Sequence, residues 1–229
     1  MKNAFNLIAA LAVVCLCASC NNDPEGPTDF SGGCEAVDLG LSVKWASYNV
    51  GAHDVESLGS YFAYGETTEK TNYDWSADGD YKWGIFNADA KPLYGMTKYT
   101  GDSVVGGDGL KTLQAVDDAA TANWGTKWRT PTLDEIKELI DSTKCKWTWD
   151  EVKRGFTVTG LKTGNSIFLP AAGYRNGSET FDVGNSCFYW SSSVYQSGPS
   201  HAYYLFPSIP DWFAGIRSDG LSVRAVTEY

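Results

Sequence analysis

The distribution of helix and strand signals is the feature that most limits the folds open to this 229-residue chain. Helix signals occur in only two short stretches near the middle, and short strand-like segments with glycine turns precede and follow them. A parallel sheet would require a regular alternation of strands and helices, which the sequence lacks. The pattern predicts an α+β domain with two short helices packed on small antiparallel sheets and long loops.

Both predicted helices have recognisable ends. The first is an alanine-rich stretch that opens with Asp117 and Asp118, whose charges suit a helix N-terminus, and runs to Asn123, with Gly125 as its stop. In the second, Thr130 is a candidate N-cap, and Thr132 has capping-box spacing to Glu135. The apolar residues of this second helix fall on one face, as expected for packing on a core: Leu133, Ile136, Leu139 and Ile140.

Strand signals flank the helices. Apolar residues alternate strictly from Val37 to Trp45, which predicts a half-buried strand, and the aromatic segment Gly59–Gly65 predicts another. Residues 66–109 are polar and aromatic without a clear period, so we expect long packed loops that contain short strands. Four later strands are expected from composition and flanking turns: Phe156–Thr159, Ser166–Leu169, Ala202–Phe206 and Leu221–Val226.

The N-terminus has the composition of a secretory signal. Lys2 precedes an apolar run over residues 7–16, and small residues lead to Cys20. The run is shorter than the roughly 20 residues of a membrane-spanning helix. The Leu16-Cys17-Ala18-Ser19 sequence resembles a bacterial lipobox, which predicts a signal peptide over residues 1–19 and lipidation of Cys20. Ordinary cleavage with release is the alternative.

These features place the mature protein at the outer membrane or cell surface, held by its lipid alone. Residues 20–33 contain two prolines and end in two glycines, so they predict a flexible tether. Residues 34–229 match one domain in size, with no later linker. The net charge of −10 argues against a nucleic-acid partner, because nucleic-acid affinity depends largely on Lys and Arg.

Metal and cysteine chemistry have little support. Three cysteines follow Cys20, namely Cys34, Cys145 and Cys187, and an odd number leaves at least one thiol unpaired. A disulfide between Cys34 and Cys145 remains an option. With His53 and His201 as the only histidines and no ligand-spaced cysteines, no metal site or cofactor is expected.

Several long side chains are expected to build the scaffold. The arginines Arg129, Arg217 and Arg224 should pair with carboxylates in this acidic domain. The following tryptophans lie beside helix or strand signals and are assigned to the core: Trp128, Trp147, Trp149 and Trp190.

Aromatic residues make up 14% of the chain, enough to supply a binding face as well as a core. We expect non-covalent recognition by rigid rings with neighbouring Ser and Asp groups between Phe188 and Leu221. Strand alternation implies that about half of these residues point inward. The predicted ligand-binding residues are Tyr189, Tyr195, His201, Tyr203, Asp211, Trp212, Phe213, Ser218 and Asp219.

The mature chain resembles the Fibrobacter succinogenes major paralogous domain, a family of exported proteins. The resemblance rests on VDLGLSVKWASYNVGA from Val37, YFAYGET from Tyr61, DAATANWGTKWRTPTLDEIKELI from Asp118, CKWTW from Cys145, NSIFLPAAGYRNG from Asn165, YWSSS from Tyr189 and RSDGLSVRAV from Arg217. It implies a C-type-lectin-like fold that binds an extracellular protein or glycan. Relatives often carry a cysteine at the position of Tyr48, so a family disulfide to Cys145 is not expected here.

The same fold class includes variable proteins of diversity-generating retroelements, whose C-terminal face is randomised at adenine-bearing codons. Randomising AAC codons never yields Lys, Glu, Gln, Met or Trp, and residues 180–227 contain no Lys, Glu or Met. On that hypothesis Trp190, Gln196 and Trp212 are fixed scaffold positions. A β-rich aromatic surface with few long charged side chains explains the same deficit.

Three other function classes were weighed. Formylglycine-generating enzymes share a phrase similar to Trp128–Thr132, but their closely spaced cysteine pair has no counterpart here, so we expect no enzyme and no catalytic residue. The calcium-binding Glu-Pro-Asn and Gln-Pro-Asp motifs of sugar-binding lectins are also missing. A structural or assembly lipoprotein without a small ligand is the main alternative to a recognition module.

Overall fold

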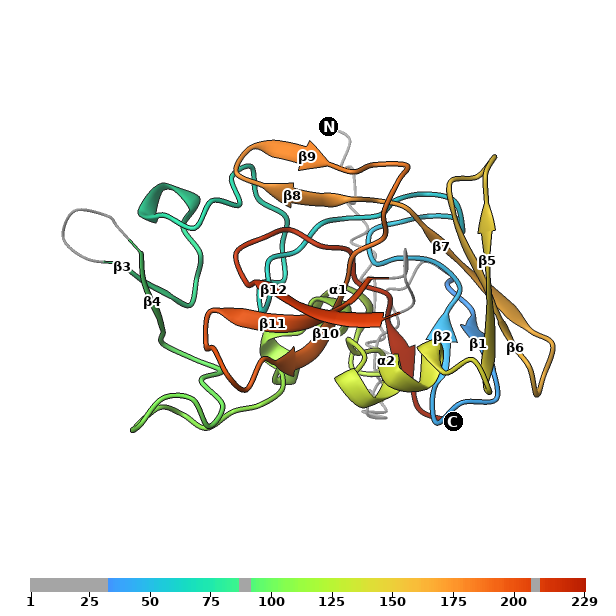
Figure 1. The fold of residues 1–229 in the computed structure, drawn as a ribbon, viewed down its shortest axis with the longest axis horizontal. Coiled ribbons are helices and arrows are strands. Elements are labelled where there is room, and N and C mark those ends of the chain that lie inside the picture. The colour runs from blue at the N-terminus through green and yellow to red at the C-terminus, as the bar shows by residue number, and fades with distance from the viewer. Residues whose placement is uncertain (1–32, 87–91, 207–210) are drawn as a thin grey trace, which may run out of the picture.

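The computed structural model describes residues 33–86, 92–206 and 211–229 (Figure 1). The predicted signal peptide, the lipidation site Cys20 and the tether up to residue 32 lie outside these ranges. The helices are η1 (Ala77–Gly79), η2 (Ala115–Asp117), α1 (Ala119–Trp124) and α2 (Leu133–Ile140). No helix within the described ranges has the length and apolarity needed to cross a membrane.

The described strands form five small sheets in which every pairing is antiparallel. They are β1 (Ala36–Val37), β2 (Lys44–Ala46), β3 (Gly84–Phe86), β4 (Pro92–Met96), β5 (Cys145–Asp150), β6 (Gly155–Gly160), β7 (Ser166–Pro170), β8 (Tyr174–Asn176), β9 (Glu179–Phe181), β10 (Tyr189–Val194), β11 (His201–Phe206), β12 (Asp211–Ile216) and β13 (Val226–Thr227). The sheet orders are β1-β2-β13, β3-β4, β5-β6-β7, β8-β9 and β10-β11-β12. The fold is therefore α+β, as predicted.

The β10-β11-β12 sheet lies at the centre of Figure 1, between the β3-β4 hairpin and the β5-β6-β7 sheet. Helix α2 packs on all three central strands, and the β8-β9 hairpin runs along another side of the molecule. The predicted short strands within residues 66–109 are confirmed as β3 and β4.

Both helices begin as their cap residues require. The Asp118 carboxylate accepts a hydrogen bond from the Thr121 amide at the start of α1, and Gly125 ends this helix with a φ of 91°. At α2 the Thr132 hydroxyl and the Glu135 carboxylate form the expected capping box. The prediction that Thr130 caps this helix was wrong, because the reciprocal hydrogen bonds select Thr132.

The alternating segment from residue 37 to residue 45 is not one strand, which corrects the prediction. Its apolar side chains from Leu39 to Trp45 are buried and Val37 is partly buried, but the chain turns after Val37, where the Asp38 carboxylate accepts a hydrogen bond from the Gly40 amide. The chain then doubles back, so that β1 and β2 pair with each other, Val37 opposite Trp45. An alternation of apolar residues indicates which side chains face the core. It does not require a continuous ladder of backbone hydrogen bonds to a neighbouring strand.

Two other predicted strands are reduced to short contacts. The segment Gly59–Gly65 contributes a bridge between Phe62 and Leu221, and the segment Leu221–Val226 forms strand only at its last residue. Five strands were missed: β5, β8, β9, β10 and β12. In β10, five of the six residues are buried and three consecutive residues are serines, so both faces are covered and no alternation of apolar and polar residues marks the strand.

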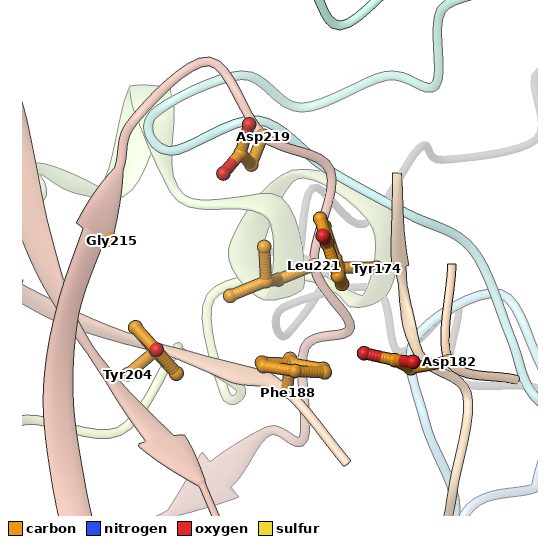
Figure 2. A pocket seen from close by; sticks show the side chains of 7 residues that line it. All are labelled: Tyr174, Asp182, Phe188, Tyr204, Gly215, Asp219 and Leu221. Atoms are coloured by element: carbon orange, nitrogen blue, oxygen red, sulfur yellow. The ribbon is translucent and has the colours of Figure 1, made fainter. Parts of the chain in front are cut away.

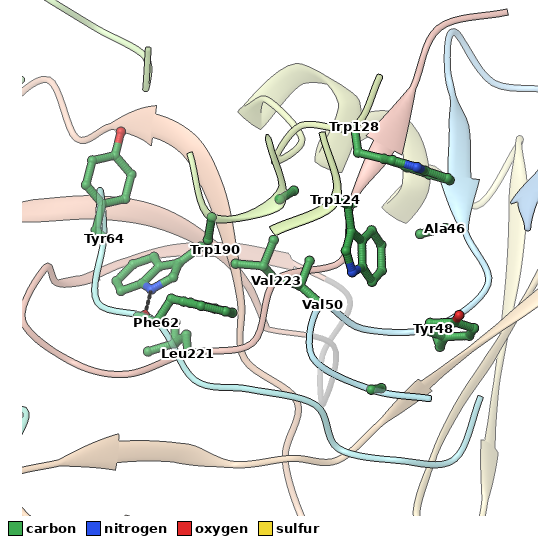
Figure 3. Packing of buried hydrophobic residues seen from close by; sticks show 14 of the residues in the cluster. Ala46, Tyr48, Val50, Phe62, Tyr64, Trp124, Trp128, Trp190, Leu221 and Val223 are labelled. Atoms are coloured by element: carbon green, nitrogen blue, oxygen red, sulfur yellow. Dashed lines mark hydrogen bonds between the residues drawn. The ribbon is translucent and has the colours of Figure 1, made fainter. Parts of the chain in front are cut away.

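Aromatic packing dominates the core. Trp190 lies among Phe62, Tyr64 and Leu221, and its indole N–H donates to the Phe62 carbonyl oxygen at 2.7 Å (Figure 3). A second cluster packs α2 against the β5-β6-β7 sheet and against Leu205 of β11. Trp128 and Trp190 are fully buried as predicted, while Trp147 and Trp149 are partly buried at the edge of the second cluster.

Two fully buried arginines, Arg217 and Arg224, bind the C-terminal segment to the rest of the domain. Neither has a carboxylate partner among the described residues. Arg217 donates to the carbonyl oxygens of Lys98, Tyr99 and Pro199 and to the Tyr81 hydroxyl. The prediction that Arg217 and Arg224 pair with carboxylates was wrong, because mainly backbone carbonyl oxygens accept from their guanidinium groups instead.

Arg224 is held in the same way, by the Asn49 side chain and the carbonyl oxygens of Ala46, Ser47 and Phe168. Arg129 alone of the three follows the expectation, with ion pairs to Glu135 at 2.6 Å and Glu228 at 2.7 Å.

The three cysteines after residue 20 are buried and free. Cys34 belongs to the cluster around Trp190, whereas Cys145 belongs to the cluster around α2, so the disulfide considered between them is not formed. Burial raises the pKa of Cys145 to about 11 and that of Cys187 to about 12. These thiols are therefore protonated at neutral pH.

Candidate functional site

The central β10-β11-β12 sheet carries most of the predicted ligand-binding residues, and strand alternation divides them between its two faces. Tyr204 of β11 lies opposite Trp190 of β10 and Phe213 of β12, so these three rings share one face. Leu205, the next residue along β11, lies opposite Trp212 on the other face.

The face that carries Trp212 is turned toward α2. The rings of Tyr195 and Tyr203 pack edge to face with their centres 5.4 Å apart, and those of Tyr203 and Trp212 pack in the same way with their centres 5.2 Å apart. Lys137 of α2 places its Nζ atom 5.7 Å from the centre of the Trp212 ring. His201 lies beside Tyr195 and bonds the Ser200 hydroxyl at 2.9 Å. This face is a packed aromatic ladder.

The opposite face opens into a pocket of about 280 Å³ (Figure 2). Phe188, Tyr204 and Gly215 line it from the sheet side, and Tyr174 and Asp182 line it from the β8-β9 hairpin. Asp219 and Leu221 complete the wall from the segment that follows β12. The pocket thus lies where the sheet, the β8-β9 hairpin and the segment after β12 come together.

The aromatic wall is continuous. The rings of Tyr174 and Phe188 pack edge to face with their centres 5.1 Å apart. The rings of Phe188 and Tyr204 are tilted toward each other with their centres 5.8 Å apart. Phe206 and Phe213 extend this row toward solvent, and Phe213 is 41% exposed. Within the described residues neither the Tyr174 nor the Tyr204 hydroxyl makes a hydrogen bond, so both can serve a ligand.

Local backbone structure fixes this arrangement. Arg175 of β8 exchanges two backbone hydrogen bonds with Gly220, which joins the β8-β9 hairpin to the segment that carries Asp219. Gly215 lies against the Tyr204 ring, and a Cβ atom there would sit 3.0 Å from Tyr204 Cε1. A side chain at position 215 would therefore require the Tyr204 ring to shift by a few tenths of an ångström.

Two carboxylates give the pocket its charge. Asp219 accepts a hydrogen bond from the Asn176 amide at 2.8 Å, yet burial raises the pKa of Asp219 to about 6. Asp182 is exposed at the rim. None of the described residues that line the pocket is Lys, Arg or His, so their carboxylates give it a negative charge at neutral pH.

The structure separates the predicted site residues into four groups. Phe213 and Asp219 belong to the pocket side of the sheet. Four residues lie on the side of α2: Tyr195, His201, Tyr203 and Trp212. Asp211 is exposed at the start of β12, where its carboxylate accepts from the Trp212 amide. Two residues cannot meet a ligand, and they are described next.

Tyr189 and Ser218 are corrections to the predicted site. Tyr189 is 2% exposed, and its hydroxyl donates to the Pro170 carbonyl oxygen at 2.8 Å, so the ring belongs to the core. Ser218 is fully buried. Alternation already predicted that some members of the list point inward, but which ones depended on how the sheet packs.

Sequence reasoning missed most of the pocket wall. Tyr174 and Asp182 precede the expected region, and their place beside it follows only from the contact between β8 and the segment at Gly220. Phe188 and Tyr204 lie within that region and were passed over in favour of Tyr189 and Tyr203, their neighbours in sequence. The spacing of Tyr204 and Phe206 was a usable signal, because residues two apart in a strand share a face.

Comparison with family models, with curated proteins and with solved structures found no match to this chain. The described residues contain no group of three or more His, Cys, Asp or Glu side chains arranged to hold a metal ion. The aromatic and acidic pocket is therefore the site on which a functional proposal rests.

Proposed function

We propose that this chain is an exported, lipid-anchored recognition module with a C-type-lectin-like fold, which binds an extracellular protein or glycan at the pocket beside the β10-β11-β12 sheet. The observation that carries the proposal is the pocket itself, with its aromatic wall, two carboxylates and two tyrosine hydroxyls that make no hydrogen bond to any described residue. Rings of this kind supply contact area at low entropic cost, and the polar groups orient a ligand.

The raised pKa of Asp219 supports the same site. A carboxylate held in an apolar pocket costs stability unless a ligand uses its charge, so such groups concentrate at functional sites. The pattern of two helices among many small antiparallel sheets agrees with the family resemblance at the level of fold class.

A pair of neighbouring tyrosines on β11 tests the site. Tyr204→Ala removes a ring from the pocket, while the matched control Tyr203→Ala removes a ring from the α2 side of the same strand. Both variants and the wild-type protein are probed on arrays of glycans and cell-surface proteins, with circular dichroism to verify folding. We expect Tyr204→Ala to lose at least tenfold in affinity and Tyr203→Ala to keep wild-type binding.

If Tyr203→Ala loses binding and Tyr204→Ala keeps it, the binding site lies on the α2 side, where four of the sequence-predicted residues lie. If the wild-type protein binds nothing on either array, the recognition proposal fails and a structural or assembly lipoprotein is the better description.

The diversified surface is a finer form of the same proposal. Its support is the lack of Lys, Glu and Met over residues 180–227. The gene neighbourhood tests it: a reverse transcriptase and a near-copy template of the codons from Tyr189 to Val226 are expected, and without both the retroelement hypothesis fails while ligand binding stands.

A further inference from the structure

The rings of the pocket are arranged as the side of a cage. Tyr174, Phe188 and Tyr204 follow one another around the cavity at ring distances of 5.1 and 5.8 Å (Figure 2). The face of an aromatic ring carries partial negative charge, and several such faces around one space attract a cation. A neutral apolar ligand would gain burial here but would make no use of this charge distribution.

The carboxylates add to that field, and no basic side chain cancels it. Arg175 belongs to the adjacent strand, but its guanidinium donates to the Ser178 carbonyl oxygen and lies over the Tyr73 ring at 5.0 Å. Arg154, near the turn after β9, pairs with Glu151 and Asn185. The negative charge of Asp182 and Asp219 is thus left for a ligand.

The size of the pocket selects what enters. Sites for whole small molecules usually measure about 300–1,000 Å³, whereas this pocket measures about 280 Å³. It therefore suits one group the size of a side chain, presented by a larger partner, better than an oligosaccharide. The exposed Phe213 beside the pocket offers further apolar surface to such a partner.

We propose that the pocket formed by Tyr174, Phe188, Tyr204, Asp182 and Asp219 binds a protonated or methylated amine on an alkyl chain, namely the side chain of a lysine on a partner protein. This rests on the proposed recognition function and narrows its ligand class. The rings enclose the ammonium group, Asp219 neutralises it from within, and Asp182 attracts it from the rim.

The ionisation of Asp219 makes this binding sensitive to pH. The groups that face Asp219 are Asn176 and Tyr174 from β8 and Tyr204 from β11, and Asp182 shares the pocket; Gly215 of β12 carries no charge. Burial raises the pKa of both tyrosines, so they stay neutral below pH 8. The pKa of Asp219 is about 6, so the pocket loses this charge in mild acid.

Choline and 3,3-dimethylbutan-1-ol are suitable probes, because they share one shape and differ in the charge of the central atom. Each is titrated at constant ionic strength into the purified protein while NMR chemical shifts are followed. Lysine and trimethyllysine, each acetylated at the α-nitrogen and methylamidated at the carboxyl group so that only the side chain is charged, represent the peptide source. Glucosamine represents an amino sugar. We expect choline and the lysine compounds to bind at least tenfold more tightly than the neutral alcohol and glucosamine.

Asp219→Asn separates the charge from the shape of the pocket, and Asp211→Asn is the matched control, since Asp211 is an exposed carboxylate of the same sheet outside the pocket. Choline affinity should fall at least fivefold in Asp219→Asn and stay within twofold in Asp211→Asn. In the wild-type protein it should fall roughly tenfold from pH 7.5 to pH 5, and this dependence should vanish in Asp219→Asn.

Equal affinity for choline and the neutral alcohol, or unchanged choline binding in Asp219→Asn, would overturn the cation assignment. Tighter binding of glucosamine than of the lysine compounds would overturn it in favour of a sugar. In each of these cases a ligand from the arrays that is lost in Tyr204→Ala still supports the recognition function. The two proposals can therefore fail separately.

Discussion

Replacing Asp219 by asparagine should stabilise the protein at neutral pH. The substitution keeps the size of the side chain and an oxygen that can accept from Asn176, but it removes a charge that burial disfavours. The folded-state pKa of Asp219 lies above its unfolded value. The protonated carboxyl group therefore contributes stability that is complete below the unfolded pKa and is lost as the pH rises through the folded pKa.

The magnitude follows from the two pKa values. The pKa of Asp219 rises from 3.8 to about 6, and each pKa unit corresponds to about 1.4 kcal/mol, which gives an upper value of roughly 3 kcal/mol. Because water still reaches part of this carboxylate, we expect the gain in Asp219→Asn at pH 7 to be about 1–3 kcal/mol. For a domain of this size that corresponds to about 2–4 °C in Tm per kcal/mol.

The assay is urea denaturation of the wild-type protein and of Asp219→Asn at a series of pH values from 3.5 to 7.5. The difference between their free energies of unfolding should be smallest near pH 3.5, grow between pH 4 and 6, and level off above pH 7. Asp182→Asn is the control, because Asp182 is an exposed carboxylate of the same pocket and its replacement should shift the curve little.

A pH-independent difference between Asp219→Asn and the wild-type protein would refute this reasoning, because it would mean that Asp219 ionises as freely in the folded state as in the unfolded chain. A variant less stable than wild type at pH 7 would show that the Asn176 contact outweighs the burial of the charge. The expected gain in stability also has a functional meaning, since a charge that costs stability and serves a ligand is typical of binding sites.

Two further predictions concern the scaffold and the anchor. Arg217→Met should lower the free energy of unfolding by about 2–4 kcal/mol, because it leaves the carbonyl oxygens of Lys98, Tyr99 and Pro199 buried without donors. Urea denaturation measures this loss, and a change below about 0.5 kcal/mol would contradict the prediction. Cys20→Ala should abolish incorporation of labelled fatty acid and release the protein from membranes, and a variant that is still labelled would place the lipid elsewhere.

Local sequence signals predicted the parts of the fold that depend on near neighbours. The capping box at Thr132 and Glu135 lies within one turn, so its residue types suffice to begin α2. The inward side chains between Val37 and Trp45 were also correct, since alternation depends on backbone geometry alone. The continuous strand expected there was wrong, because the partner of β1 turned out to be β2.

Predictions that depended on distant partners fared less well. The arginines Arg217 and Arg224 were expected to find carboxylates, but the folded chain surrounds them with carbonyl oxygens from remote segments. Tyr189 was expected to face a ligand but is buried in the core, and the pocket is lined instead by its neighbour Phe188 and by Tyr204. A shift of one residue along a strand reverses the face, and composition does not fix the face.

The sequence by itself determined an acidic, aromatic α+β domain with two capped helices, and it predicted an export signal and a C-terminal binding face. Only the tertiary structure decided that Tyr174 and Asp182 meet Tyr204 and Asp219 around one pocket. The physical reason is that helix caps and alternation arise from interactions over a few residues, whereas the pocket arises from the backbone contact between Arg175 and Gly220, which are 45 positions apart in the chain.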